Sequence, residues 1–248
     1  MNQYKVISGC EPFYIKGNNI GCLLIHGFTS SPYEFRFLVD HLKNKSYTVH
    51  VPLLPGHGRS HQVLKNCSWY DWYDSVKNEL FQLKKICTKI FIIGLSMGGA
   101  LALHLAAHYE VNGVVALAPG LYLKNKLAPL AHFLYPFFPY KRKFSGPDIS
   151  NNEKTLTYDK IPLKSLSQLL KFFKHLEHDL QDIYAPTLVI FSKKDHVVQG
   201  KSAITIYKKI ASTDKRILEL NHSYHILTLD LEREKVFDEI SYFIESLL

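Results

Sequence analysis

The chain is predicted to fold as an α/β protein with a mostly parallel central sheet flanked by helices. Short apolar runs alternate with helix-like segments along most of the 248 residues, which is typical of repeated strand–helix–strand units. The composition is 46% hydrophobic and 21% charged, which is ordinary for a globular protein. The length suits one large domain of this class.

The first half of the chain divides into strands and helices at cap and turn residues. Ser68 fits the N-cap position of a helix, because its hydroxyl can accept a backbone hydrogen bond there. Pro119-Gly120 ends a strand, since neither residue continues one well. The expected strands lie at residues 21–26, 47–51, 89–93 and 113–118, and the expected helices at 32–43, 68–85 and 99–107.

The pattern changes after residue 120. No strand-like run occurs from 121 to about 184, leucines recur at helical spacing between 163 and 176, and residues 127–140 are rich in Phe, Tyr and Pro. We expect residues 121–184 to form a small helical cap (lid) over a core made of 1–120 and 185–248. Within the second part of the core, strands are expected at 186–191 and 216–220, and helices at 201–210 and 236–247.

The stretch Gly94-Leu95-Ser96-Met97-Gly98 joins a predicted buried strand to a predicted helix. A Gly-x-Ser-x-Gly sequence in this context is typical of a strained turn that exposes a nucleophilic serine. Glycine is required where side chains would collide with neighbouring backbone. The helix N-terminus beneath Ser96 also favours developing negative charge. Ser96 is therefore the candidate nucleophile.

A serine hydroxyl needs a base to take its proton and an acid to orient that base. Asp195 directly follows a late strand and fits the acid position, with a turn or helix-capping role as the structural alternative. The base is chosen between His222 and His225, which both follow the last strand, and we assign His225. Three other aspartates precede strands and would face the wrong end of the sheet: Asp179, Asp182 and Asp214.

An oxyanion intermediate needs backbone donors near the nucleophile. The N–H group of Met97, directly after Ser96, is the first candidate, and that of Phe28, in the loop after an early strand, is the second. Gly27 lets this loop approach a substrate closely, and His26 is expected to brace the loop. Losing one such donor typically costs about 3–4 kcal/mol of transition-state stabilisation.

Histidines and cysteines elsewhere give no sign of a metal centre. His57 and His61 stand at helical spacing, but neighbouring Pro and Gly residues favour a loop over a metal site. The catalytic scheme needs no metal and no organic cofactor. The widely spaced cysteines contain no C-x-x-C pair and are expected to be buried reduced thiols: Cys10, Cys22, Cys67 and Cys87.

The charge and the ends of the sequence limit the classes of partner. The formal net charge is +8, yet the basic residues are scattered apart from Lys141-Arg142-Lys143, and no nucleic-acid motif is found. A solvated surface is the default interpretation, and weak attraction to anionic lipid is the functional alternative. The first ten residues lack the apolar core of a signal peptide, and no run is long enough to span a membrane. We expect a cytoplasmic protein.

Taken together, the motifs resemble those of bacterial monoacylglycerol lipases and related short-chain carboxylesterases of the α/β-hydrolase superfamily. The resemblance spans nearly the whole chain, and its last two segments are the most specific. The segments that carry it are Leu24-Ile25-His26-Gly27-Phe28-Thr29, Pro52-Leu53-Leu54-Pro55-Gly56-His57-Gly58, Trp69-Tyr70-Asp71-Trp72, Gly94-Leu95-Ser96-Met97-Gly98-Gly99, Asp195-His196-Val197-Val198 and Ser223-Tyr224-His225-Ile226-Leu227-Thr228-Leu229-Asp230.

The resemblance implies an α/β-hydrolase fold and hydrolysis of apolar acyl esters through Ser96, His225 and Asp195. It also implies that Asp159 hydrogen-bonds a polar alcohol such as glycerol, although a surface or helix-capping role explains this residue equally well. Departures occur at residues 30–32, at 193–194 and over 121–150, where the cap matches poorly. A thioesterase or peptidase on the same fold is the second hypothesis, and a non-catalytic binding protein is the third. The oligomeric state is left open.

Overall fold

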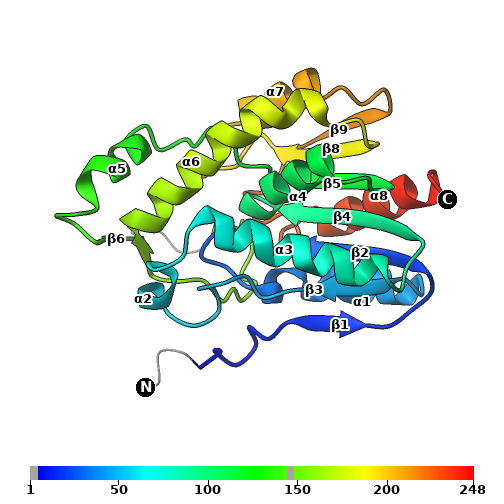
Figure 1. Ribbon diagram of the computed structural model, residues 1–248, viewed down its shortest axis with the longest axis horizontal. Coiled ribbons are helices and arrows are strands. Elements are labelled where there is room, and N and C mark those ends of the chain that lie inside the picture. Colours follow the sequence, from blue (N-terminus) through cyan, green and yellow to red (C-terminus); the bar gives the residue numbers. More distant parts are fainter. Residues whose placement is uncertain (1–4, 144–147) are drawn as a thin grey trace.

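A central sheet organises the computed structural model, which describes residues 5–143 and 148–248. Over these residues the main sheet has seven strands in the order β1-β3-β2-β4-β5-β8-β9, and all neighbours are parallel except β1 and β3 (Figure 1). The predicted parallel sheet is confirmed. Its strands are β1 (Phe13–Ile15), β2 (Ile20–Ile25), β3 (Thr48–Val51), β4 (Lys89–Leu95), β5 (Gly113–Leu117), β8 (Thr187–Ser192) and β9 (Lys215–Leu220).

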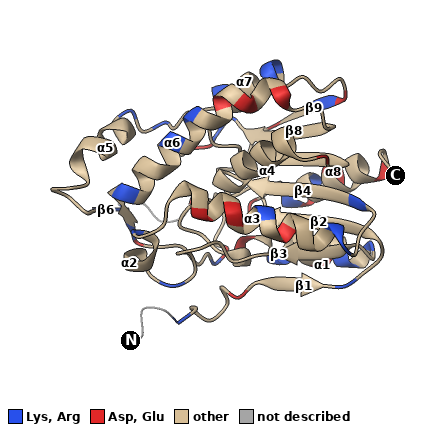
Figure 2. Ribbon diagram, viewed as in Figure 1, with Lys and Arg blue, Asp and Glu red and all other residues tan. Residues whose placement is uncertain are grey.

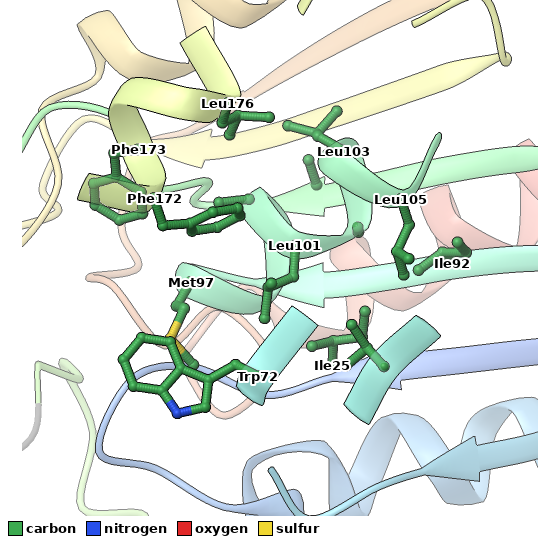
Figure 3. Packing of buried hydrophobic residues seen from close by; sticks show 14 of the residues in the cluster. Ile25, Trp72, Ile92, Met97, Leu101, Leu103, Leu105, Phe172, Phe173 and Leu176 are labelled. Carbon is green, nitrogen blue, oxygen red and sulfur yellow. The ribbon is translucent and has the colours of Figure 1, made fainter. Parts of the chain in front are cut away.

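Helices cover both faces of this sheet and define two apolar cores. One core lies between the sheet and helices α3, α4, α6 and α7, and Figure 3 shows its centre, where Phe172 and Leu176 of α6 lie beside Leu103 of α4. The other core lies beneath α1 and α8. These helices are α1 (Arg36–Asn44), α3 (Trp69–Lys84), α4 (Met97–His108), α6 (Leu163–Asp179), α7 (Lys201–Lys209) and α8 (Arg233–Glu245).

Local signals explain where two of these helices begin. Ser68 caps α3, and the capping box is complete because the Asp71 carboxylate accepts the Ser68 N–H at 2.7 Å. The helix predicted at 32–43 instead starts as the 3-10 turn η1 (Pro32–Phe35) before α1. Pro32 suits a first helical turn, because its missing N–H would have no helical partner there.

The segment between β5 and β8 lies over one end of the sheet (Figure 1). Besides α6 it contains η2 (Ala128–Leu130), α5 (Ala131–Leu134) and η3 (Leu180–Asp182). The prediction that no strand occurs here is wrong, because β6 (Tyr140–Arg142) pairs antiparallel with β7 (Lys160–Pro162). These strands have three residues each and several exposed side chains, so they leave no apolar run. The boundaries of the cap at 121 and 184 stay a prediction.

Three smaller expectations need correction or refinement. His61 does not lie in a loop but begins α2 (His61–Leu64), which Ser60 caps. β1 was not predicted, because three residues with intermediate or exposed burial carry almost no signal. The four cysteines are free thiols, and all are buried except Cys67, which is half-buried.

The surface charge is dispersed, as predicted. Figure 2 shows Lys and Arg residues on many elements, with acidic residues among them on α3. Within the described residues, no helix is both long enough and apolar enough to cross a membrane.

Candidate active site

Ser96 lies in a strained turn between β4 and α4. Its φ of 57° is in the left-handed region, which non-glycine residues rarely adopt. The turn is held by its own backbone, since the Ser96 N–H donates to the Leu117 carbonyl at 2.8 Å. A Cβ on Gly94 would overlap the carbonyl of Gly98, and a Cβ on Gly98 would overlap that of Ile25. The glycines of the motif are therefore required by close backbone contacts.

Asp195 and His225 form a buried pair. They follow β8 and β9, and His225 Nδ1 lies 2.7 Å from Asp195 Oδ2. The exposed fractions are 3% for Asp195 and 8% for His225. The other carboxylate oxygen of Asp195 accepts the N–H groups of Val197 at 2.7 Å and Val198 at 2.8 Å. The structure thus brings the predicted acid and base together in a fixed orientation.

Burial and pairing act in opposite directions on this pair. Burial disfavours both charged forms, so alone it would raise the pKa of Asp195 and lower that of His225. The mutual attraction of the two charges and their hydrogen bond outweigh burial. As a result the pKa of Asp195 is below its ordinary value and the pKa of His225 is above its ordinary value.

His26 braces the loop that follows β2, as predicted. Its Nε2 accepts the N–H of Leu54 at 3.1 Å, and its Nδ1 donates to the carbonyl of Gly27 at 3.0 Å. Burial lowers the pKa of His26 to about 4, so the imidazole is neutral at pH 7 and the tautomer with a proton on Nδ1 satisfies both bonds. His26 therefore fixes the loop backbone.

The two predicted oxyanion donors are Met97, which directly follows Ser96, and Phe28, which follows Gly27, where an added Cβ would lie 3.6 Å from the Ser96 Cβ. Met97 is the first residue of α4 and is fully buried. The Phe28 ring packs edge-on against Trp72, with 5.7 Å between ring centroids. That their N–H groups bind an oxyanion stays a prediction.

Glu34 is a buried carboxylate that the sequence analysis missed. It accepts the N–H of Gly27 at 2.6 Å and the hydroxyl of Ser30. A Cβ built on Gly27 would be 3.6 Å from both the Glu34 carboxylate and the Ser96 Cβ. Burial raises the pKa of Glu34 to about 7, and its charge also acts on His225. The signal in the sequence is a carboxylate among apolar neighbours, in the run Pro32-Tyr33-Glu34-Phe35.

Asp148, in the segment before α6, connects the loops that carry the predicted acid, Asp195, and the predicted base, His225. Its carbonyl accepts the N–H groups of His225 at 3.1 Å and Ile226 at 3.2 Å. Its carboxylate accepts the N–H of His196 at 2.9 Å and lies 2.7 Å from His196 Nδ1. Since His196 is the neighbour of Asp195, one residue holds both loops. Its negative charge also contributes to the raised pKa of His225.

Asp159 directly precedes β7, with its side chain 74% exposed and its carboxylate 3.9 Å from His61 Nδ1. Its carbonyl accepts the N–H of Lys143 at 2.9 Å, and the Lys143 ammonium donates to the hydroxyl of Thr29 at 2.9 Å. The predicted alcohol-binding residue is therefore linked to the loop that contains Phe28. Among the residues that the structure describes, no hydrogen bond joins Asp159 to Asp195 or His225.

The sequence match defines the class of this protein. Residues 20–232 match the Hydrolase_4 family, described as serine aminopeptidase, S33. Together with the sheet topology, this match shows that the chain belongs to this family of α/β-hydrolases and is a hydrolase.

Individual relatives agree with this class. The chain is 36% identical over 247 residues to the thermostable monoacylglycerol lipase of Bacillus sp. (strain H-257), covering 95% of this chain and 94% of the relative. It is 30% identical to the carboxylesterase of Bacillus subtilis (strain 168), covering 96% and 97%. A solved structure reported with the metagenome-derived lipolytic enzymes LipS and LipT has a TM-score of 0.94 and 32% identity, covering 98% of this chain and all of that chain. The predicted resemblance is confirmed.

The role of Asp148 can be tested by substitution. We expect Asp148→Ala to reduce kcat for p-nitrophenyl butyrate by about 10- to 100-fold, because small misplacements of catalytic groups are costly. Asp148→Asn keeps an acceptor for His196 but loses the charge, so the pKa of His225, measured by NMR titration, should fall. A purely structural role would leave that pKa unchanged.

The matched control is Asp238→Asn, which neutralises an exposed carboxylate on α8. It should change neither kcat nor the His225 titration. A normal kcat and an unshifted His225 pKa in both Asp148 variants would contradict the role of Asp148 in holding the two loops.

Proposed function

We propose that the protein hydrolyses carboxylic esters of apolar acyl groups, monoacylglycerols among them, through an acyl-enzyme on Ser96. The observation that carries this proposal is the buried pair of Asp195 and His225 at the sheet edge where the strained Ser96 turn also lies. The printed names of the relatives, monoacylglycerol lipase and carboxylesterase, support the same substrate class.

In the proposed mechanism, His225 removes the hydroxyl proton of Ser96 as Oγ attacks the ester carbonyl carbon. The resulting tetrahedral oxyanion accepts hydrogen bonds from the N–H groups of Phe28 and Met97. His225 then passes its proton to the leaving alcohol as the ester C–O bond breaks, which yields the acyl-enzyme. Water repeats the sequence and releases the acid. Asp195 holds the imidazole tautomer and stabilises its cation.

An open cavity of about 710 Å³ between α5 and α6 suits the acyl chain. Its lining includes Leu121, Leu170 and Phe173. It adjoins the nucleophile turn, because Gly120 donates its N–H to the Ser96 carbonyl at 3.1 Å and a Cβ on Gly120 would overlap the Phe173 ring. Cavities of this size bind small amphiphilic ligands well.

A peptidase is the second candidate, because the matching family is described as a serine aminopeptidase and the three catalytic groups suit esters and amides alike.

We also infer a cytoplasmic location. The four free thiols suit a reducing compartment.

The catalytic roles predict a defined pH dependence. A protonated imidazole cannot accept the Ser96 proton, and Asp195 raises the pKa of His225 above its ordinary 6.5. The kcat/KM for p-nitrophenyl butyrate should therefore rise with pH through a midpoint above 6.5.

Asp195→Asn should reduce kcat by up to about 10⁴-fold, and Ser96→Ala should abolish labelling by a fluorophosphonate probe.

Burial also raises the pKa of Glu34 to about 7, so Glu34→Gln separates the two titrations. The acidic limb should persist in this variant, with a lower midpoint because the Glu34 charge raises the pKa of His225. Equal labelling of the wild-type protein and the Ser96→Ala variant would refute the assignment of Ser96 as the nucleophile. Faster cleavage of amino-acid p-nitroanilides than of the matching esters would favour the peptidase instead.

Asp159 should matter only for substrates with a polar alcohol. We expect Asp159→Asn to raise KM for 1-monooctanoylglycerol by about 10-fold, the scale of one charge-assisted hydrogen bond. Activity on p-nitrophenyl octanoate, which has the same acyl group, should stay within about twofold. Lys160→Gln, which changes the neighbouring exposed charge, is the control. Equal effects on both esters would reject a role in alcohol recognition.

The cap also carries an apolar surface that suits a lipid interface. We call this the cap patch; its members, all exposed by 39% or more, are Leu127, Leu130, Phe133, Leu134, Phe137 and Phe138. Exposed basic residues flank it in the chain at Lys124, Lys126, Lys141 and Arg142. Apolar side chains bordered by basic ones are complementary to an anionic membrane surface. We infer weak docking of the cap patch on such a surface.

Removing aromatic rings from the cap patch should weaken this docking. The double variant Phe137→Ser/Phe138→Ser, whose residues do not line the cavity proposed for the acyl chain, should bind vesicles of phosphatidylglycerol and phosphatidylcholine at least about tenfold less well in co-sedimentation. The reason is that two exposed phenyl groups can no longer be buried in the lipid surface. Hydrolysis of dissolved p-nitrophenyl butyrate should be unchanged. Tyr242→Ser removes an exposed aromatic ring from α8 and serves as the control. Unchanged vesicle binding by the double variant would exclude the cap patch.

A further inference from the structure

Two imidazoles and a carboxylate meet between helices α4 and α6, outside the site described above. His104 and His108 stand four residues apart on α4, and Asp179 is the last residue of α6. Among the described residues, this group alone places three potential metal-ligating atoms within 4.8 Å of one another. Asp179 Oδ2 lies 2.7 Å from His104 Nδ1 and 3.9 Å from His108 Nε2.

These separations suit a single small ion. Ligand atoms at 2.0–2.1 Å from a tetrahedral Zn²⁺ lie about 3.3 Å apart, and the two distances to Asp179 bracket this value. Small rotations of exposed His108 and half-buried Asp179 would equalise them. His104 would then carry its proton on Nε2 and present Nδ1 to the ion.

The surroundings favour a preorganised His104. This side chain is 5% exposed, and its ring is held between Tyr73, 4.6 Å away, and Phe172, 5.4 Å away, as ring-centroid distances. A further imidazole, His175, lies one turn before Asp179 on α6 and interacts electrostatically with His104. One ligand is thus rigid and buried while another, His108, is open to solvent and leaves an entry path.

The donor set selects the kind of ion. Two neutral imidazole nitrogens with one carboxylate oxygen suit Zn²⁺ and related transition metals, and water can complete the coordination. Mg²⁺ and Ca²⁺ prefer all-oxygen sites.

We propose that His104, His108 and Asp179 bind a divalent transition-metal ion of the zinc class, which links the helix that follows the Ser96 turn to the long helix of the cap. The ion takes no part in ester hydrolysis. Because it binds the folded chain through two helices, it stabilises the native state by mass action.

The test uses full-length, untagged protein and Zn²⁺ as the probe, with Mg²⁺ in parallel. Isothermal titration should show one Zn²⁺ per chain, and Zn²⁺ should raise the melting temperature. His108→Ala, which alters an exposed side chain, and Asp179→Asn should each weaken binding at least about tenfold and remove the thermal shift. Titration with Co²⁺ should give a visible absorption band that both variants lose.

The matched control is His178→Ala, an exposed histidine on the same helix α6, which should bind Zn²⁺ like the wild type. The proposal is wrong if wild-type protein shows no saturable Zn²⁺ binding, or if His108→Ala and Asp179→Asn bind as tightly as His178→Ala. Comparable binding of Mg²⁺ would overturn the assignment to the zinc class. Ester hydrolysis by metal-free protein should be normal, so this result is independent of the function proposed for Ser96.

Discussion

The close contact between β4, α4 and the end of β2 is the constraint on which the site depends. No side chain fits at Gly94 or Gly98, because each faces a carbonyl oxygen of a neighbouring segment. This contact forces Ser96 into a left-handed conformation, and such strain persists only where the surroundings enforce it. It also sets the separation between Ser96 and the loop that begins at His26. The position of Ser96 and that of the loop beside it therefore have one common cause.

Buried polar groups around this contact keep the loops rigid. His26 and Glu34 both bind the backbone of Gly27, one as a donor to its carbonyl and the other as an acceptor of its N–H. Each is desolvated, so an unmade hydrogen bond would be costly. The hydroxyl of Thr228 also donates to the Glu34 carbonyl at 2.7 Å, which ties this loop to the one that carries His225.

The parts of the site that sequence reasoning found are those with local signals. Ser96 lies in a short motif between a strand and a helix, and Asp195 and His225 follow strands, so motif and chain order suggested them and left His222 as the alternative to His225. The Asp148 carboxylate accepts the N–H of His196, which is 48 residues away in the chain. Asp148 itself lies in a segment that has no periodic sequence pattern. Such pairings depend on tertiary packing. The ribbon of β6 and β7 was missed for a related reason, since strands of three residues leave too little pattern to detect.

Asp148 belongs to the segment between β5 and β8 and contacts the loops that follow β8 and β9. Its carbonyl and carboxylate hold the backbone at His225 and beside Asp195. Two further bonds strengthen the same junction: the Ser150 N–H donates to Asp230 at 3.1 Å, and the Asn151 amide donates to the Leu229 carbonyl at 2.8 Å. Residues 148–151 thus hold the loops that carry Asp195 and His225, so substitutions in them should alter turnover. The segment between β5 and β8 therefore contributes to the geometry of the site as well as to the wall of the adjoining cavity.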